Sequence, residues 1–370
     1  MSNKLNSIPF NDLARIHSPL LDEFKDNFGR LVTNSSLVLG EEVALFENEL
    51  AVAEGCQYAV GVNSGTTAIE LALRALGVGE GDEVITTAFT FVATCFAIIQ
   101  IGATPVLVDI NPFSGLMNPD LLEKVITPKT RAVVFVTLHG RVENLEEIQS
   151  FCHRNNLHFV IDAAQSHLGT FNGEPQAKFC DVATLSFYPG KNLGALGEGG
   201  AVLTNLPEVR NRIAIMRDWG AEEKYNHVYW GGNFRLESLQ ASFLRTKLRH
   251  LLSWTKERQE IAKLYTGKLQ PNLLMNEVSS GGSHVYHIFA IRSNQRSVIV
   301  DLLNREGIGY GFHYPRAIHQ QPAYSKHVKA PLDLGNSEWL ANTTLSIPLF
   351  PCQTKAEIDS VIRILNRNVA

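Results

Sequence analysis

The feature that most constrains the fold of this chain is a regular alternation of short apolar runs with helical patterns, which begins at about residue 58. The first three pairs are YAVGV with TTAIELALRAL, DEVITT with FVATCFAIIQI, and PVLVDI with PDLLEKVI. Such alternation is typical of βαβ units. Later runs rich in Val, Ile and Phe fit strands buried on both faces: RAVVFVTLH, LHFVIDAA, DVATLSFY and GGAVLTN. We therefore predict an α/β fold in which helices cover a mostly parallel sheet.

The C-terminal third of the chain follows a different pattern. Residues 236–268 are periodic and free of proline, which predicts one long helix or a bent pair of helices. After them, strand-like and helix-like runs mix without regular alternation: VYHIFAIR, SVIVDLLNREG, YGFHYP and KAEIDSVIRILNRN. A chain of 370 residues also exceeds what one hydrophobic core usually organises. We predict a large α/β domain over residues 1–250, with an N-terminal arm and helix in 1–35, and a smaller α+β domain over 251–370.

Composition argues against several classes of protein. The net charge of -4 gives no basic surface that could follow a nucleic-acid backbone. The five cysteines lie far apart without a Cys-x-x-Cys pair, so neither a disulfide framework nor a metal site is predicted. The N-terminus lacks the features of a signal peptide, and no run is long and apolar enough to span a bilayer. We expect a cytoplasmic protein that binds neither nucleic acid nor membrane.

Small and hydroxylated residues follow the first predicted strand. Asn63-Ser64-Gly65-Thr66-Thr67-Ala68 leads directly into a helical pattern, at the strand end where ligands of open α/β sheets bind. The free N–H groups and the helix dipole favour a phosphate there, and Gly65 permits its close approach. Taken alone, however, the segment is more commonly a plain helix cap.

An aspartate, Asp162, closes the predicted strand HFVID. A buried carboxylate needs a partner. It can cap the following loop or pair with an arginine, or it can face a cationic group of a ligand at the edge of the sheet. The residues around Asp162 leave both possibilities open.

A lysine, Lys191, lies in the glycine-rich segment from Ser186 to Gly200 (SFYPGKNLGALGEGG), which precedes another predicted strand. Pro189 and Gly190 break regular structure just before Lys191, so its amine can turn toward a pocket. A desolvated lysine has a lowered pKa and can form a Schiff base with a carbonyl. The alternative for this segment alone is a flexible loop with a solvated lysine.

In this order and spacing, the segments NSGTTA, DAAQ and SFYPGKNLG…GEGG resemble the DegT/DnrJ/EryC1/StrS family of sugar aminotransferases. The resemblance covers nearly the whole chain, from Pro9-Phe10 to Ser346-Ile347-Pro348-Leu349. It implies the aspartate-aminotransferase-like fold (fold type I), pyridoxal 5'-phosphate as cofactor, and a homodimer with shared active sites. It also implies that the chain converts the keto group of a nucleotide-linked sugar to an amine in amino-sugar biosynthesis, with L-glutamate as the amino donor.

The resemblance assigns roles to residues that match the family motifs. Lys191 would hold the cofactor and transfer protons, and Asp162 would pair with the pyridine nitrogen. The other residues expected to touch the cofactor are Gln165 and Phe91 on the two faces of the ring, Gly65, Thr66 and Ser186 at the phosphate, and Asn233, which would reach the phosphate of the neighbouring subunit.

The substrate residues are implied by the segment GYGFHYPRAIHQQPAY, residues 309–324, although paired histidines in such a loop are often surface residues. It resembles a family pattern at the mouth of the pocket. The expected sugar contacts are Tyr188, His313, Tyr314 and His319. Combined with SFYPGK around the lysine, the pattern favours a 3-keto-6-deoxyhexose over a 4-keto sugar, whereas the nucleotide and the stereochemistry stay open.

Two departures from the family pattern concern the substrate contacts. His139-Gly140-Arg141-Val142-Glu143 replaces an aromatic-Gly-Gln-Pro stretch, and Trp230-Gly231-Gly232 replaces a tyrosine ahead of Asn233.

Three other classes of protein are less consistent with the sequence. A nicotinamide-dependent dehydrogenase is disfavoured, because no Gly-x-Gly-x-x-Gly follows the first strand and Gly194 to Gly200 precedes a strand. An aldolase or a cysteine desulfurase that uses the same cofactor is also disfavoured, since no cysteine lies in a glycine-bounded loop. A catalytically silent regulator of the same fold would have no need to keep Lys191, Asp162 and Gln165 together.

Overall fold

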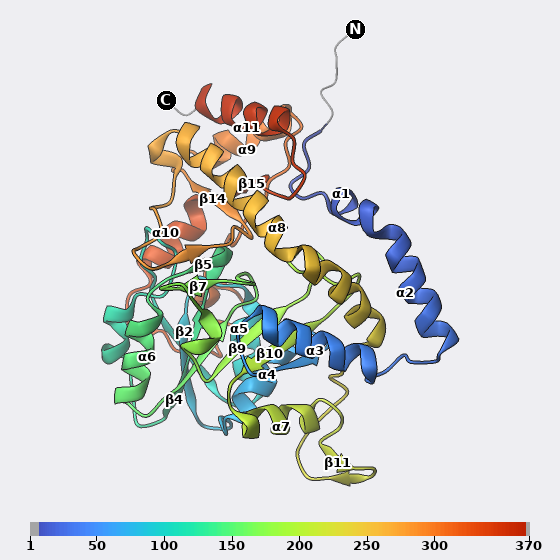
Figure 1. Cartoon of the computed structure of the whole chain (residues 1–370). Helices are drawn as coiled ribbons and strands as arrows, with labels where there is room; N and C mark the ends of the chain where they lie inside the picture. The colour runs from blue at the N-terminus through green and yellow to red at the C-terminus, as the bar shows by residue number, and fades with distance from the viewer. Residues whose placement is uncertain (1–6, 368–370) are drawn as a thin grey trace.

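A seven-stranded sheet forms the centre of the computed structural model, which describes residues 7–367 (Figure 1). Its strands, in their order across the sheet, are β1 (Tyr58–Val62), β10 (Gly200–Thr204), β9 (Val182–Ser186), β6 (His158–Asp162), β4 (Thr130–Val136), β2 (Glu83–Thr87) and β3 (Thr104–Val108). Strand β10 runs opposite to the other six strands of this sheet, which all share one direction. The predicted α/β fold with a mostly parallel sheet is therefore confirmed.

Helices lie between most of the strands, as the alternation predicts. They are α4 (Gly65–Ala75), α5 (Val92–Gln100), α6 (Leu145–Arg154) and α7 (Pro207–Met216). The segment PDLLEKVI differs, because it forms the short 3-10 helix η2 (Pro119–Lys124). The Asn118 side chain caps this turn, and the N–H of Val125 closes it on the carbonyl of Leu122 three residues earlier.

One long helix, α8 (Ser238–Lys268), runs across the molecule (Figure 1). Its 31 residues form a single helix, which was one of the two alternatives predicted for residues 236–268. The N-terminal helices are α1 (Leu13–His17), α2 (Leu21–Thr33) and α3 (Glu41–Ala53), with the 3-10 turn η1 (Ser18–Leu20) between the first two. Helices α2 and α3 both pack against α8. Phe24 of α2 meets Phe243 of α8 with ring centroids 5.1 Å apart.

The C-terminal part has its own apolar cluster, to which the second half of α8 contributes Ile261 and Tyr265. Its elements are β14 (Phe289–Arg292) paired with β15 (Thr344–Ile347), and the helices α9 (Arg296–Arg305), α10 (Gly335–Thr343) and α11 (Lys355–Arg367), with the 3-10 turns η5 (Pro271–Leu273) and η6 (Ile318–Gln320). The predicted boundary at residue 250 falls inside α8, and the division into two domains stays a prediction. Residues 1–6 and 368–370 of the predicted domains lie outside the described residues.

Short strand pairs and turns complete the fold. They are β5 (Arg141–Val142) with β13 (Ser283–His284), β7 (Thr170–Phe171) with β8 (Glu174–Pro175), β11 (Ala221–Glu223) with β12 (Asn226–His227), and the 3-10 turns η3 (Leu138–Gly140) and η4 (Gln176–Lys178). The segment YGFHYP is not a regular strand, and only Gly311 forms a bridge, with Ser346 of β15.

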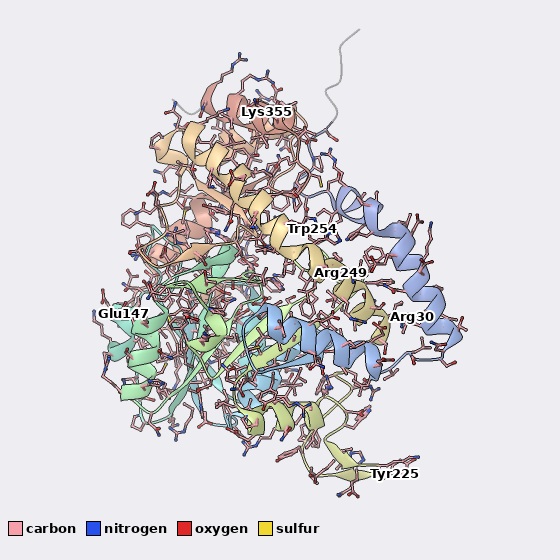
Figure 2. The ribbon with its side chains drawn as sticks, in the orientation of Figure 1. Arg30, Glu147, Tyr225, Arg249, Trp254 and Lys355 are labelled. Atoms are coloured by element: carbon pink, nitrogen blue, oxygen red, sulfur yellow. The ribbon has the colours of Figure 1, made fainter. Side chains whose placement is uncertain are left out.

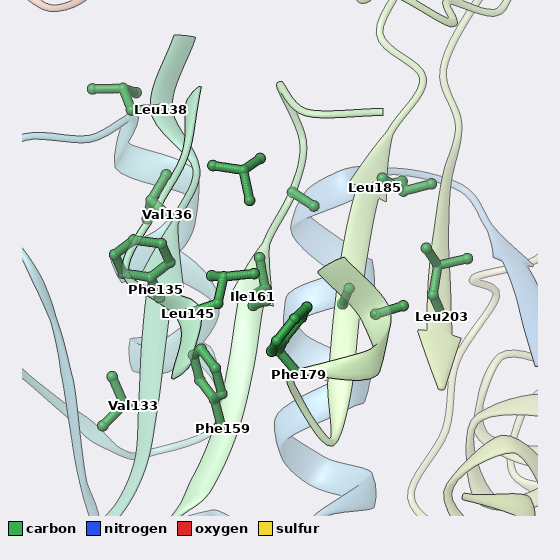
Figure 3. Packing of buried hydrophobic residues seen from close by; sticks show 14 of the residues in the cluster. Val133, Phe135, Val136, Leu138, Leu145, Phe159, Ile161, Phe179, Leu185 and Leu203 are labelled. Carbon is green, nitrogen blue, oxygen red and sulfur yellow. The ribbon is translucent and has the colours of Figure 1, made fainter. Parts of the chain in front are cut away.

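The core explains why the central strands carry continuous apolar runs. Val133 and Phe135 of β4 pack with Phe159 and Ile161 of β6 on one face of the sheet (Figure 3). The alternating residues Ala132, Val134 and Val160 belong to a second cluster on the opposite face. Because both faces are filled by apolar side chains, polar chemistry is confined to the edge where the strands end.

Within residues 7–367, none of the helices is both long enough and apolar enough to cross a bilayer. In the same residues, no cluster of His, Cys, Asp and Glu side chains has an arrangement that could hold a metal ion.

Candidate active site

A cavity of about 760 Å³ opens where β1, β6 and β9 end and β10 begins. Side chains from the N-terminal segment, the sheet edge and the C-terminal part line it. Ten of the residues predicted from the sequence are among them: Gly65, Thr66, Phe91, Asp162, Gln165, Ser186, Tyr188, Lys191, His313 and Tyr314. Folding therefore brings together motifs that are far apart in the chain.

The start of helix α4 forms one wall of the cavity. Ser64 is its N-cap, and its hydroxyl accepts a hydrogen bond from the N–H of Thr67 at 3.1 Å. As the first two helical residues, Gly65 and Thr66 have N–H groups without a partner inside the helix. A Cβ on Gly65 would lie 2.6 Å from the Cβ of Ser186, so only glycine allows this approach. Ser64 thus caps the helix, and the free N–H groups beside it suit an anion.

Asp162 is buried at the end of β6 and lines the same cavity. Its carboxylate accepts a hydrogen bond from the Thr94 hydroxyl at 2.8 Å and another from the N–H of Ala164 at 3.2 Å. Burial raises the pKa of Asp162, while these bonds and the nearby Lys191 oppose the shift. The carboxylate thus caps the following loop and, within residues 7–367, forms no pair with an arginine, so a cationic ligand group could stabilise it as an anion.

Lys191 lies in a tight turn between β9 and β10. Its N–H donates to the carbonyl of Tyr188 at 2.8 Å, and the N–H of Phe187 donates to the carbonyl of Gly199 at 2.7 Å where the two arms of the loop meet. Burial lowers the pKa of Lys191 to about 8, although Asp162 acts in the opposite direction. More of the neutral, nucleophilic amine is therefore present near neutral pH than in a solvated lysine.

Side chains of helix α8, one of them in contact with His17 of α1, hold the loop that carries Lys191. The amine of Lys247, a side chain that is 2% exposed, donates to the carbonyl of Gly194 at 2.5 Å and lies 3.0 Å from Nε2 of His17. Burial lowers the pKa of His17 to about 4, so its neutral ring can accept this bond. The side-chain oxygen of Gln240 accepts from the N–H of Leu196 at 3.0 Å.

Aromatic and amide groups also line the cavity. The amide of Gln165 donates to the hydroxyl of Tyr314 at 3.1 Å and accepts from the N–H of His139 at 2.6 Å. The exposed ring of Phe91 lies 5.5 Å from the ring of Tyr314. Such flat side chains are suited to contact a planar ligand.

His313 faces the cavity from the C-terminal part of the chain. Its Nδ1 lies 2.8 Å from the Ser346 hydroxyl, and the ring of Phe10 stacks on it at 5.7 Å. Burial lowers the pKa of His313 to about 4, and therefore the imidazole is neutral in the physiological range.

Two predicted residues do not line this cavity. Asn233 is exposed, and its backbone carbonyl accepts from the side-chain amide of Asn63 at 3.2 Å. His319 lies with its Nε2 2.8 Å from a carboxylate oxygen of Glu338. Their predicted roles stay predictions.

The unusual segment HGRVE directly follows Leu138, which lines the cavity. Arg141 and Glu143 form a buried ion pair, and Arg141 also donates to the carbonyls of Asn276 and Glu277 at 2.7 and 2.6 Å. Glu143 accepts from the N–H of Ser279 at 2.6 Å. This departure from the family pattern therefore fixes residues 276–284 beside the site, and neither charged side chain lines the cavity.

Several residues of the site escaped the sequence analysis. Phe10 and Asn11 reach the cavity from the N-terminal segment, and His287 reaches it from just before β14. Thr94, which binds Asp162, lies one turn beyond Phe91 in helix α5. Helical spacing could have linked Thr94 to Phe91, but no local pattern marks the others, because tertiary packing alone brings them to the cavity.

Comparison with known proteins gives a consistent picture. Residues 20–366 match the model of the DegT/DnrJ/EryC1/StrS aminotransferase family. The dTDP-3-amino-3,4,6-trideoxy-alpha-D-glucose transaminase of Streptomyces venezuelae is 38% identical, over 93% of this chain and 91% of the relative. The UDP-N-acetyl-3-dehydro-alpha-D-glucosamine 3-aminotransferase of Acidithiobacillus ferrooxidans is 35% identical, over 98% of both chains.

Solved structures are similar over the same extent. DesV of S. venezuelae superposes with a TM-score of 0.94 at 36% identity and covers 98% of each chain. NtdA of Bacillus subtilis, solved with the bound cofactor PMP, has a TM-score of 0.90 at 27% identity, over all of this chain and 87% of the other.

Proposed function

The chain belongs to the DegT/DnrJ/EryC1/StrS aminotransferase family, and from this premise we propose that it aminates carbon 3 of a nucleotide-linked keto-hexose with pyridoxal 5'-phosphate as cofactor. The observation that carries the proposal is the position of Lys191. Its amine, whose pKa is lowered to about 8, shares one cavity with the buried carboxylate of Asp162 and the N-terminus of helix α4.

The residues around the cavity fit this cofactor at three points. The free N–H groups of Gly65 and Thr66 and the hydroxyl of Ser186 suit its phosphate. Asp162 suits a protonated ring nitrogen, because a nearby positive charge stabilises a buried carboxylate. The partly neutral amine of Lys191 suits a covalent bond to the aldehyde.

The side chains divide the chemistry between them. When bound, the cofactor supplies an aldehyde that bonds to amines and a ring that withdraws electrons from the adjacent carbon. Lys191 would hold it and, once released by the amino donor, its free Nζ would take a proton from one of the two carbons that flank the transferred nitrogen and deliver it to the other. Asp162 would keep the ring nitrogen protonated, and Gln165 and Phe91 would orient the ring.

Two observations support carbon 3 as the position of amination. Both relatives described above carry position 3 in their names, although one name contains dTDP and the other UDP. Tyr188 is exposed at the cavity beside Lys191, and His313 and Tyr314 line it from the C-terminal part. These three side chains can bind sugar hydroxyls and thereby select the carbonyl that faces Lys191.

Further parts of the proposal concern the partners. We propose L-glutamate as the amino donor and a homodimer in which Asn233 reaches the cofactor phosphate of the other subunit. The exposure of Asn233, outside the cavity of its own chain, supports this arrangement. The two-domain division near residue 250 and the cytoplasmic location are proposed on the sequence arguments alone.

The test is a comparison of half-reactions. The purified protein is mixed with glutamate, and then with a panel of 3-keto and 4-keto sugar nucleotides, while the visible absorbance of the cofactor is followed in a stopped-flow instrument. We expect glutamate to bleach the visible band and a 3-keto sugar to restore it faster than its 4-keto isomer. Absence of a visible band would overturn the assignment of the cofactor. Preference for the 4-keto isomer would overturn the assignment of carbon 3 as the position of amination.

A further inference from the structure

The structure assigns a role to His287, a residue that the proposed reaction does not use. We propose that its imidazole carries hydrogen only on Nδ1, so that Nε2 presents a hydrogen-bond acceptor to the cavity and positions a hydroxyl group of the sugar substrate. The hydrogen on Nδ1 follows from geometry, and its absence from Nε2 follows from the burial that keeps the ring neutral. The role toward the sugar rests on the proposed function.

A chain of hydrogen bonds fixes the hydrogen on His287. The amide nitrogen of Asn192 lies 3.1 Å from the carbonyl oxygen of Val285. A carbonyl can only accept, so this end of the amide is the NH₂ group and the other end is the oxygen. That oxygen lies 3.3 Å from Nδ1 of His287, which must therefore donate. Asn192 is buried, so the protein and not solvent sets its orientation.

The second nitrogen of His287 is left without a hydrogen. Burial lowers the pKa of His287 well below the ordinary value, and the positive charges of Lys191 and Arg258 add to this shift. A neutral imidazole has one N–H group, and here it is on Nδ1. Nε2 thus keeps a lone pair directed away from Asn192.

The free acceptor of His287 belongs to a residue of the cavity wall. The residue lines the cavity wall, and within residues 7–367 its Nε2 has no hydrogen-bond partner. It differs from His167, whose two ring nitrogens are fully enclosed. A group that enters the cavity with an N–H or O–H can therefore bind His287.

Two donors could meet this acceptor, namely the amine of Lys191 and a hydroxyl of the substrate. Although the charge of Lys191 influences His287, no hydrogen bond joins their side chains. His313, an expected sugar contact, lines the same cavity. We therefore assign His287 to the sugar, which carries several hydroxyl groups.

Two matched substitutions separate the contacts of His287. In His287→Asn, the short amide can still donate to Asn192 but no longer reaches the position of Nε2. In His287→Gln, the longer amide can place an oxygen near that position. We expect His287→Asn to lower kcat/KM for the keto-sugar half-reaction about five- to tenfold, as the loss of one neutral hydrogen bond does, with His287→Gln close to wild type. The glutamate half-reaction should change less than about twofold in both.

A spectroscopic measurement tests the hydrogen position without activity. Two-bond ¹H–¹⁵N correlation spectra of histidine-labelled holoenzyme distinguish the two neutral forms, and the signal that His287→Asn removes belongs to His287. We expect the form with hydrogen on Nδ1. The opposite form, equal losses in both half-reactions, or a fully active His287→Asn variant would each overturn the proposal. Failure of the wild-type protein to react with glutamate would instead overturn the proposed function and leave the hydrogen position standing.

Discussion

At the scale of single residues, burial shifts the two central ionisable groups toward their neutral forms. The pKa of Lys191 is lowered to about 8 and that of Asp162 is raised, and each charge partly reverses the shift of the other. Desolvation favours the free amine that attacks a carbonyl, while Asp162 can regain its charge when a cation binds. The site is thus prepared for a ligand that brings both an aldehyde and a protonated nitrogen.

The lowered pKa of Lys191 predicts a pH profile. In protein freed of cofactor, labelling of Lys191 by an amine-reactive reagent, quantified by mass spectrometry, should rise with pH and level off above about 8, because only the neutral amine reacts. Solvent-exposed lysines should continue to gain reactivity toward about pH 10.4. Asp162→Asn removes the charge that raises the pKa of Lys191, so the midpoint should move to lower pH. A profile like that of the exposed lysines would contradict the desolvation of this residue.

Replacement of Lys191 separates binding from turnover. Lys191→Ala should abolish amination, because no other amine lines the cavity among the described residues. The phosphate site at Gly65 and Thr66 and the carboxylate of Asp162 remain, so cofactor should still copurify, though without the covalent link. Release of the cofactor by denaturation and its quantification check this. A variant that keeps both the yellow colour and full activity would rule out the assigned role of Lys191.

The sequence predicted those site residues that carry their own local signal. Asp162 closes an apolar run and Lys191 follows Pro189 and Gly190, so each stands out in its segment. His287 and Phe10 carry no such signal, because they reach the cavity through contacts between distant parts of the chain. Apolar periodicity reports which face of an element is buried, but not which distant element covers it.

At the scale of elements, strand ends and helix starts position the chemistry. The antiparallel strand β10 begins at Gly200, where a Cβ would lie 2.4 Å from the backbone of Ser64. Glycine at this point lets the loop of Lys191 return against the start of helix α4. Apolar periodicity predicted these strands and helices well. It failed for η2, where a capped 3-10 turn replaces a helix, and it could not show that α8 continues unbroken between the two apolar clusters.

Helix α3 ends at a buried acid, Glu54, which gives a prediction for stability. Its carboxylate accepts from the N–H of Leu168, in the loop that carries Gln165, at 3.0 and 3.2 Å. Burial raises the pKa of Glu54 from 4.5 to about 7. Between these values the folded protein binds more protons than the unfolded chain, so the contribution of Glu54 to stability falls as pH rises through this window.

Glu54→Gln keeps an acceptor for Leu168 but does not titrate. We compare the unfolding free energy of the variant with that of wild type at each pH. This difference should increase in favour of the variant by about 2 kcal/mol from pH 5 to pH 8, as the raised pKa implies. Urea unfolding at the two pH values measures this. Glu306→Gln is the matched control, because Glu306 is an exposed acid at the C-cap of α9 and should show no such gain. An equal gain in both variants would contradict the argument from burial.

At the scale of the whole molecule, apolar side chains remain on the surface. Tyr225 marks the turn of the projecting hairpin formed by β11 and β12 (Figure 2), where it is 83% exposed, and Trp230 is 84% exposed. On helix α2, Phe28 and Val32 are about half exposed. Large aromatic groups in water commonly mark sites of association. The sequence alone could not separate these side chains from core residues, because burial depends on the assembled fold.

The segment that follows the hairpin carries Asn233, which is exposed and lies outside the cavity of its own chain. In a symmetric dimer, both subunits use the same surface patch at the interface. The Asn233 of each subunit could therefore complete the active site of the other subunit. Lys191→Ala and Asn233→Ala should then each be inactive or strongly impaired as homodimers. A hybrid dimer contains two different sites. The site in the Asn233→Ala subunit has its own Lys191 and receives Asn233 from the Lys191→Ala subunit, so it is intact. The site in the Lys191→Ala subunit lacks both residues.

Mixing the two purified variants under conditions of subunit exchange should therefore restore activity. With equal amounts and random exchange, half of the dimers are hybrids with one intact site each, which sets an upper limit of about a quarter of wild-type activity. Native mass spectrometry of an isotope-labelled and an unlabelled subunit verifies the exchange. Two copies of Lys191→Ala, one of them labelled, form the control and should gain nothing. If exchange is complete and the mixed variants stay inactive, Asn233 does not act across the interface, and each chain must build its site from its own residues.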